Sequence, residues 1–310
     1  MPKSPLNQYP ASSIRSWVEW ASQAFDEAGL FYGHGTDNAI DEAAFLISHA
    51  LNTDFDFSGF DIDQPLSTAQ NESIHALLND RITSRKPAAY LVGEAWFAGY
   101  PFYVDEHVLV PRSPLAELIT DKFEPWIDSR QVRSVIDIGT GSGCIALACA
   151  LYLPQARVDA VDIDEHALAV TQRNIQRYQL EDRVRAVQSD LLTQVPSHHY
   201  DVIISNPPYV AISEYDSLPA EFLQEPQLGL TAGDDGLDCV RDILAKADEY
   251  LTEQGILVVE VGNSQAALEQ AYPRVAFTWL EFEHGGEGVF LLDKKQIQEH
   301  REYFQEQVRQ

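Results

Sequence analysis

Cysteine is scarce in this sequence, since only three occur in 310 residues, at Cys144, Cys149 and Cys239. They form no CxxC pair and have no nearby histidines in a zinc-binding arrangement, so the common zinc motifs are excluded and we expect no metal site. So few cysteines are typical of a protein kept in a reducing compartment. Cys144 and Cys149 fall in a segment that we expect to be helical, where packing as a small buried side chain is the ordinary role of cysteine.

Long apolar runs are also missing. No segment approaches the roughly 20 consecutive apolar residues that a membrane-spanning helix needs. The N-terminal stretch MPKSPLNQYPASSIRSW lacks the apolar centre of a secretory signal peptide. We therefore expect a cytoplasmic protein without a membrane partner.

Positive charge is the third shortage. The chain has 21 lysines and arginines against 48 aspartates and glutamates, which gives a formal charge of −27. A protein that binds a nucleic-acid backbone should have a basic stripe, and none is found, so we expect no DNA partner. An acidic surface attracts basic partners instead. Plain solubility, or adaptation to a salty cell interior, would explain the charge equally well.

The residues that are present predict a small helical domain at 1–88. The stretch SIRSWVEWASQAFDEAGL begins with serines suited to capping a helix, and it places five apolar side chains on one face: Ile14, Trp17, Val18, Ala21 and Phe25. The stretches DEAAFLISHAL and STAQNESIHALLNDRITSRK continue the helical pattern. Residues 89–114 are then rich in aromatic and β-branched residues broken by glycine and proline, which predicts a β-hairpin linker that ends in a turn at Pro111–Pro114.

Residues 115–295 alternate between short apolar runs and helix-like stretches. Seven runs are typical of strands: VRSVIDIG, ARVDAVDID, RVRAVQSD, YDVIISN, GILVVEVGN, VAFTWLEF and GVFLLD. Such alternation indicates parallel βαβ units covered on both faces, and the last two runs predict a closing hairpin. We expect an α/β fold with a doubly wound, mostly parallel seven-stranded sheet. Residues 296–310 predict a polar surface helix or tail.

A glycine-rich turn follows the first of these strands, in VRSVIDIGTGSGCIALACAL. Gly139, Gly141 and Gly143 let the backbone turn tightly and approach a ligand without a Cβ in the way, and the next helix directs its free N–H groups into the turn. Two ligand classes fit. Gly141, Gly143 and Ala146 satisfy the dinucleotide pattern G-x-G-x-x-G/A. Asp137 followed by the three glycines resembles the first motif of class I S-adenosylmethionine-dependent methyltransferases.

Acidic residues end three successive predicted strands. Asp137 ends the first and could serve the ammonium group of S-adenosylmethionine, directly or through water. Asp162 ends the second, where a carboxylate accepts hydrogen bonds from both ribose hydroxyls of either cofactor, whereas Asp164 is better suited to capping the next helix. Asp190 ends the third, where a methyltransferase commonly contacts the adenine amino group. The three together favour a nucleoside-containing cofactor more strongly than any one alone.

The motif NPPY, Asn206–Tyr209, follows the fourth strand. Pro207 and Pro208 cannot continue a central strand, because each lacks the N–H that a ladder needs, so they end it and hold its exit rigid. Ligands of a doubly wound sheet bind outside the carboxyl ends of the strands, which is the edge where the glycine turn lies. The motif resembles that of amino-methyltransferases. The Asn206 side-chain oxygen and the Pro207 carbonyl can accept both N–H bonds of an amide, while Tyr209 packs its ring on the flat group.

Nearly the whole chain resembles the protein glutamine N5-methyltransferases, a family with a release-factor branch and a ribosomal-protein branch. The resemblance lies in NPPY, the hairpin AWFAGYPFYVDEHVLVPRSP, the segment FLQEPQLGLTAGDDGLD and the helical N-terminal domain. Ser113 and Pro114 stand where the release-factor enzyme typically has Pro-Glu. These two residues, with VEVGNSQ and TWLEFEHGGEGVF, favour the ribosomal branch, which methylates one glutamine of large-subunit ribosomal protein L-three. Release factors are the alternative substrate.

The resemblance implies S-adenosylmethionine as the cofactor and gives each site residue a role by position. Residues that contact the cofactor or lie at its edge would be Asp137, Gly139, Thr140, Gly141, Ser142, Gly143, Asp162, Asp190, Leu191 and Asn206. Residues that frame the glutamine would be Asn206, Pro207, Pro208 and Tyr209. Leu191 stands where the release-factor relative can carry a tryptophan against the adenine. Residues 1–88 would recognise the substrate, and the segment 210–238 would line its pocket or form a surface loop with turns at AGDDG.

Three other functions fit parts of the sequence. DNA adenine methyltransferases share the chemistry of NPPY but should have a basic DNA-facing surface. A nicotinamide oxidoreductase rests on the glycine pattern alone and leaves NPPY unexplained. A non-catalytic interaction module would have no reason to keep Asn206 beside an intact glycine turn. The charge of −27 and NPPY together favour a glutamine methyltransferase that attracts a basic ribosomal protein. Oligomeric state is not predicted.

Overall fold

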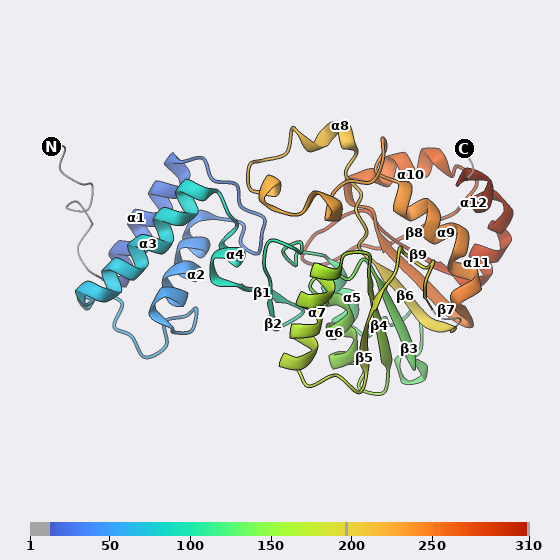
Figure 1. Cartoon of the computed structure of the whole chain (residues 1–310), viewed down its shortest axis with the longest axis horizontal. Helices are drawn as coiled ribbons and strands as arrows, with labels where there is room; N and C mark the ends of the chain where they lie inside the picture. The colour runs from blue at the N-terminus through green and yellow to red at the C-terminus, as the bar shows by residue number, and fades with distance from the viewer. Residues whose placement is uncertain (1–12, 196–197, 309–310) are drawn as a thin grey trace. The chain divides into compact units, whose positions relative to one another are not determined.

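The computed structural model describes residues 13–195 and 198–308 (Figure 1). The chain divides into two compact units. The helical unit comprises Met1–Glu94 and Pro219–Gln224, and the sheet unit comprises Ala95–Leu218 and Glu225–Gln310. In the described part of the chain, no helix has both the length and the apolar character needed to cross a membrane.

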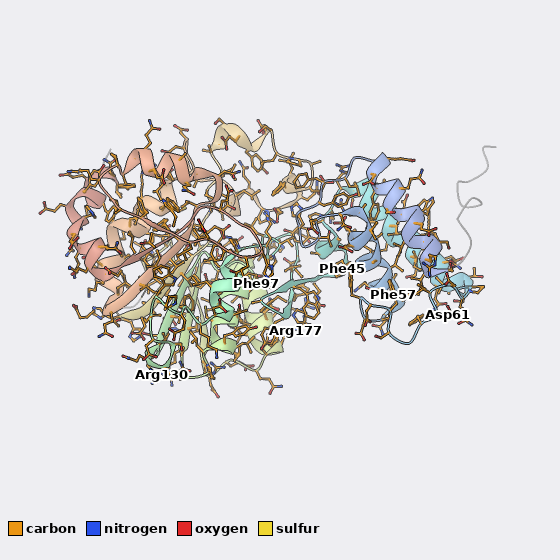
Figure 2. The ribbon with its side chains drawn as sticks, turned by 180° about the vertical axis from the view of Figure 1, so that it is seen from behind. Phe45, Phe57, Asp61, Phe97, Arg130 and Arg177 are labelled. Carbon is orange, nitrogen blue, oxygen red and sulfur yellow. The ribbon has the colours of Figure 1, made fainter. Side chains whose placement is uncertain are left out.

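The described residues of the helical unit include four α-helices: α1 (Ile14–Glu27), α2 (Ala39–Leu51), α3 (Thr68–Ser84) and α4 (Ala88–Val92). Side chains of Ser13, Asn38 and Ser67 cap the first three by accepting backbone N–H groups. Their apolar faces share one core, against which Phe45 and Phe57 pack (Figure 2). The helices predicted from the sequence are confirmed. The unit continues past residue 88, because the partly buried Leu91 and Val92 of α4 pack against the same core.

A segment far away in the sequence, Pro219–Gln224, also belongs to the helical unit. Glu221 is fully buried and lies 3.3 Å from Arg81 and 3.0 Å from Arg85. Arg81 is equally buried and forms a second ion pair with Glu42 at 2.7 Å. A buried charge is tolerated only when it is paired and hydrogen-bonded. The sequence placed this segment within the sheet domain, but Glu221 finds its counter-charges among the N-terminal helices.

A two-stranded hairpin follows α4, as the sequence predicts. Strands β1 (Glu94–Phe97) and β2 (Tyr100–Tyr103) are joined by Ala98 and Gly99, whose φ angles are 48° and 80°. Two successive positive φ angles are the signature of the tight turns that match the twist of a hairpin. Phe97 is buried in a core of the sheet unit (Figure 2).

The sheet unit is built on seven strands in the order β5-β4-β3-β6-β7-β9-β8. Their bounds are Ser134–Ile138 for β3, Arg157–Asp162 for β4, Val184–Gln188 for β5, Tyr200–Ser205 for β6, Leu251–Glu260 for β7, Thr278–Trp279 for β8 and Val289–Asp293 for β9. Strands β3 to β7 pair in parallel, whereas β9 is antiparallel to both β7 and β8. The predicted α/β fold, its seven strands and its closing hairpin are confirmed.

Helices cover both faces of this sheet (Figure 1). On one face lie α5 (Leu115–Thr120), α6 (Cys144–Tyr152) and α7 (Glu165–Arg177), and on the other α9 (Asp238–Tyr250), α10 (Gln265–Ala271), α11 (Lys294–Glu299) and α12 (Arg301–Gln307). Short helical turns span Ser129–Gln131, Ile212–Tyr215 (α8), Phe222–Gln224, Gln227–Gly229 and Gly262–Ser264. Neighbouring strand residues alternate between the two cores, with Val135 in one and Ile136 in the other.

The C-terminal residues form helices, one of the two outcomes that the sequence predicted, but some of their side chains are buried. A capping box at Asp293 begins α11, and α12 follows after His300. Ile297 and Phe304 are fully buried in the core that α9 covers. Both helices are short and mostly polar, so their few apolar side chains give only a weak periodic signal in the sequence.

Candidate active site

The glycine turn connects β3 to α6 with positive φ angles of 73°, 55° and 81° at Gly139, Gly141 and Gly143. A Cβ at Gly143 would lie 2.8 Å from Leu147 and 2.9 Å from Thr171, so no larger residue fits there without displacing a neighbour. A Cβ at Gly141 would meet nothing within 4 Å. The turn is thus tightly packed at its helical end and open at Gly141, which suits the approach of a ligand.

Helix α7 and strand β4 hold the turn in place. Thr171 donates a 2.7 Å hydrogen bond to the carbonyl of Gly141, and Asn174 donates one of 2.8 Å to the carbonyl of Ser142. The N–H groups of Gly139 and Thr140 both donate to the carbonyl of Val161 at 2.8 Å. Thr140 and Ser142 are buried. Thr171 and Asn174 were not predicted as site residues, because they lie one helix further along the chain.

Asp137 is fully buried at the end of β3. Its Oδ2 accepts hydrogen bonds from Thr140 Oγ1 at 2.6 Å and from the N–H of Ala146 at 3.1 Å. Its Oδ1 is buried and has no hydrogen-bond partner among the described residues. Burial raises the pKa of Asp137 to about 7. A buried carboxyl oxygen without a donor is costly, so this atom is suited to meeting a cationic ligand group.

Asp162 ties the end of β4 to the glycine turn. Its Oδ2 accepts a 2.9 Å hydrogen bond from the N–H of Gly141, and its Oδ1 accepts one of 3.0 Å from the N–H of Asp164. Burial raises the pKa of Asp162. Asp164 caps α7 by accepting from the N–H of His166 at 2.9 Å, as the sequence predicted. Each oxygen of Asp162 keeps a second lone pair with which it could accept a ligand hydroxyl.

Asp190 and Leu191 follow β5 at the same sheet edge. The N–H of Ser189 donates to the carbonyl of Asp162 at 2.9 Å, which fixes this segment beside the end of β4. The Asp190 side chain is exposed, and Leu191 is partly buried with a φ of 49°. At this edge, Leu191 packs against apolar side chains of the sheet unit, whereas Asp190 faces solvent.

The NPPY motif lies against the glycine turn. Ile138 pairs with Ser205 in the parallel register, and Ser205 Oγ donates to the Ile138 carbonyl at 2.7 Å. A Cβ on Gly139 would lie 3.9 Å from both the Asn206 carbonyl oxygen and Pro207 Cα. The Asn206 side chain is half-buried and has no hydrogen-bond partner among the described residues. The two motifs therefore meet at one edge of the sheet, as the sequence predicted.

Several site neighbours escaped the sequence analysis. Tyr209 donates to Glu260 Oε1 at 3.2 Å, and Glu260 Oε2 accepts from Ser113 Oγ at 2.5 Å. Arg112 forms a bidentate ion pair with the buried Glu225 at 2.7 Å. Glutamate within the apolar run VVEVG was the one available signal, because a charged residue is seldom buried in a strand without a reason.

The segment 210–238 closes on itself beside Tyr209. Val210 N–H donates to the Leu230 carbonyl at 2.8 Å, and Ala232 N–H donates to the Val210 carbonyl at 3.0 Å. A Cβ on Gly236 would lie 2.2 Å from the Tyr209 carbonyl oxygen. The base of the segment is thus fixed to NPPY within the sheet unit, whereas its residues 219–224 belong to the helical unit.

Comparison with known proteins gives two family matches. The family described as "Methyltransferase small domain" matches residues 120–234, and "PrmC N-terminal domain" matches residues 16–93. A "Ribosomal protein uL3 glutamine methyltransferase" of Francisella tularensis is 43% identical over 293 residues, which cover 94% of this chain and 93% of the relative. The protein of that name from Xanthomonas campestris is 46% identical over 288 residues, which cover 93% of each chain.

The chain belongs to the family of ribosomal protein uL3 glutamine methyltransferases. It is therefore a methyltransferase, and the predicted family resemblance is confirmed. Membership agrees with the methyltransferase interpretation of the sequence rather than with a nicotinamide oxidoreductase. A methyltransferase of solved structure from Pyrococcus furiosus is 21% identical with a TM-score of 0.46, covering 72% of this chain and 98% of that one.

The roles of single residues in this methyltransferase stay predictions. The predicted site residues do lie at one edge of the sheet. Among the three predicted acidic residues, Asp190 is the most exposed. Within the described residues, no group of three or more histidine, cysteine, aspartate or glutamate side chains could hold a metal ion.

Proposed function

We propose that this methyltransferase transfers the methyl group of S-adenosylmethionine to the N5 atom of a glutamine side chain in ribosomal protein uL3. The observation that carries the proposal is the meeting of the glycine turn with NPPY, where Gly139 approaches the Asn206 and Pro207 backbone. The names of the two relatives support the substrate. The acidic charge of −27 suits a basic ribosomal protein.

The residues at this edge fit S-adenosylmethionine. Asp137 offers a buried oxygen without a donor, which suits the ammonium of the cofactor's amino-acid end. Gly141 leaves open space above the turn, and Asp162 retains acceptor capacity for the ribose hydroxyls. Asp190 and Leu191 lie beside Asp162, where adenine would be held. When bound, the cofactor supplies an electrophilic methyl group on a sulfonium sulfur.

The chain's own task is then to orient a poor nucleophile. The lone pair of an amide nitrogen is delocalised into its carbonyl, so the amide must be fixed with that nitrogen facing the methyl group. The side-chain oxygen of Asn206 has no other partner among the described residues and can accept one N–H, while the Pro207 carbonyl accepts the other. Orientation alone can contribute about 7–11 kcal/mol to lowering a barrier in favourable cases. No strong base is needed, because the proton can leave to water after transfer.

Substrate recognition is assigned in this proposal to the helical unit. Its match to the PrmC N-terminal domain covers residues 16–93. The unit also holds residues 219–224, which come from the segment whose base is fixed to Tyr209. The unit that would recognise the substrate therefore contains residues from both sides of NPPY in the sequence, 1–94 before the motif and 219–224 after it.

The test is a labelling experiment with the purified protein and methyl-labelled S-adenosylmethionine. Ribosomal proteins including uL3, peptide release factors and unmethylated DNA are offered in parallel, and mass spectrometry locates the label. Label on a glutamine of uL3 is the expected result. Label on a release factor would keep the chemistry and overturn the substrate. Label on DNA alone would overturn the proposal and mean that NPPY serves a base.

A further inference from the structure

Tyr209 is held at three points by the last residue of β7 and by residues just after this strand. Its hydroxyl donates to Glu260 Oε1 at 3.2 Å. Its ring lies on the backbone of Gly262, where a Cβ would come within 2.7–3.1 Å of the ring edge and hydroxyl. Its carbonyl accepts a 2.7 Å hydrogen bond from Ser264 Oγ. One short segment, VEVGNS, thus contacts the hydroxyl, the ring and the backbone of the same tyrosine.

The backbone on which the Tyr209 ring lies is rigid, because the chain at Gly262 is packed directly against the chain at Gly288. Gly262 has a φ of 45°, and a Cβ there would overlap the tyrosine ring. A Cβ on Gly288 would in turn lie 2.2 Å from the Gly262 carbonyl oxygen. The N–H of Val261 donates to the Gly288 carbonyl at 2.6 Å. Backbone in such contact cannot shift to follow a moving ring.

Glu260 is the one charged side chain in this contact, and it is only 5% exposed. Its second oxygen accepts from Ser113 Oγ at 2.5 Å, while Ser113 Oγ accepts from the N–H of Leu115 at 3.1 Å. That N–H occupies a lone pair of Ser113 and so directs the hydroxyl hydrogen toward Glu260. Arg112 is the cation that faces this carboxyl, although its ion pair is with Glu225. Each Glu260 oxygen therefore receives one hydroxyl.

A buried carboxylate is costly even when hydrogen-bonded, and an apolar residue could fill the same space. What a carboxylate adds is a fixed direction for the phenol that it accepts. The parallel pairing of Ser205 with Val259 puts Glu260 on the strand beside β6, at the level of Asn206, which follows the end of β6. Glu260 therefore stands at the same sheet edge as the residues proposed to hold the glutamine amide.

We propose that Glu260 is a positioning residue for methyl transfer: by accepting the Tyr209 hydroxyl, it fixes the ring over Gly262 as a wall of the glutamine site. This inference rests on the proposed function of NPPY. Ser113 completes the arrangement by occupying the second oxygen, so that Glu260 has one acceptor atom directed at Tyr209. Residues Ser113, Tyr209 and Glu260 thus form one hydrogen-bonded chain from three separate parts of the sequence.

The test is a double-mutant cycle on full-length protein with Glu260→Leu, which has no acceptor for the Tyr209 hydroxyl, Tyr209→Phe and the double variant. Each is assayed for kcat and KM with uL3, normalised to the fraction that binds S-adenosylmethionine. Each single change should lower kcat about tenfold, the scale of one lost hydrogen bond to a charged acceptor, and should leave cofactor affinity unchanged. The double variant should be no slower than the slower single variant, because both changes remove the same interaction.

Tyr200→Phe is the matched control. Tyr200 begins β6, the strand that ends just before Asn206, and its hydroxyl also donates to a carboxylate, Asp159, at 2.6 Å. It lies at the opposite sheet edge, so its removal should leave kcat unchanged even if stability falls. Equal loss of kcat in this control would assign the effect to general destabilisation and overturn the proposal.

Additive losses in the cycle would also overturn the proposal, since Glu260 would then act independently of Tyr209. A crystal structure of Glu260→Leu provides a readout that needs no substrate. The Tyr209 ring should be displaced from Gly262 there, and an unmoved ring would refute a positioning role. If the unaltered protein does not methylate uL3, only the proposed function is refuted. The role of Glu260 is still decided by whether the Tyr209 ring is displaced in the variant.

Discussion

The hydroxyl of Thr140 donates a 2.6 Å hydrogen bond to Oδ2 of Asp137. The N–H of Ala146 donates to the same oxygen. The other oxygen of this fully buried carboxyl has no hydrogen-bond partner among the described residues. Both donors come from the turn and helix that follow Asp137 in the sequence. The glycine turn thus fixes the carboxyl in one orientation and leaves one oxygen for a ligand.

The affinity for S-adenosylmethionine should depend on pH through Asp137. Burial, and to a smaller extent the neighbouring Asp162, raises the pKa of Asp137, while the hydrogen bonds from Thr140 and Ala146 oppose the rise, and the resulting pKa is about 7. A ligand ammonium favours the ionised carboxyl. Below pH 7 a proton must therefore leave on binding, and the Kd should rise by up to about tenfold per pH unit. Isothermal titration across this range measures it.

Asp137→Asn is the control for that effect, because it keeps the shape and cannot ionise. It should bind the cofactor more weakly at pH 8 and lose the dependence near pH 7. The stability of the protein should depend on pH in the opposite direction to its cofactor affinity. Because the pKa of Asp137 in the folded protein is above the unfolded value of about 4, the free energy of unfolding falls as pH rises from about 4 to about 7. The variant should lack this fall. Identical pH profiles in both proteins would contradict the assignment.

Asn206→Ala should separate orientation of the substrate from binding of the cofactor. The side chain has no other partner among the described residues, so its loss should leave the fold and the affinity for S-adenosylmethionine mostly intact. We expect kcat to fall about a hundredfold or more, the scale for a lost preorganised polar group. Single-turnover methylation of uL3 measures the rate, and calorimetry the affinity. Equal losses of both would make Asn206 chiefly a cofactor residue.

Glu221→Ala should destabilise the helical unit. Its removal leaves the fully buried Arg81 with Glu42 as its remaining counter-charge and takes the carboxylate partner from the partly exposed Arg85. Breaking a buried ion pair by removing one partner typically costs about 3–5 kcal/mol. Chemical unfolding measures the loss. Limited proteolysis should also cut residues 210–238 faster, because Glu221 fixes part of that segment.

Asp63→Ala is the control in the same unit. Its ion pair with Arg15 at 2.6 Å is exposed, so stability and proteolysis should change little. A Glu221 variant as stable as the Asp63 variant would mean that the buried network does not hold residues 219–224 in the helical unit.

The salt dependence of methylation tests the use of the acidic charge. With a charge of −27 and a basic substrate, long-range attraction should raise the association rate by at least about tenfold at low ionic strength. Added salt screens that attraction beyond about 8–10 Å. The KM for uL3 should therefore rise with potassium chloride, whereas the Kd for S-adenosylmethionine should not. A KM that is insensitive to salt would leave the acidity to solubility alone.

The sequence by itself determined the features that depend on local pattern. The glycines of the turn, the acidic strand ends and NPPY all adjoin short apolar strands, and parallel strands present their carboxyl ends at one edge. That rule brought Asp137, Asp162 and Asn206 together without any knowledge of contacts. The helices of the N-terminal unit were equally accessible, since capping residues and the spacing of apolar side chains are properties of neighbouring residues.

Only the tertiary structure decided the partners that are distant along the chain. Ser113 and Glu260 are 147 residues apart, and Arg81 and Glu221 are 140 apart. A glutamate looks the same in the sequence whether it is solvated or buried against a hydroxyl or a guanidinium. The difference arises from desolvation, which depends on what the whole fold packs around the charge. Residues 219–224 were misplaced for that reason, because their neighbours in space are not their neighbours in the chain.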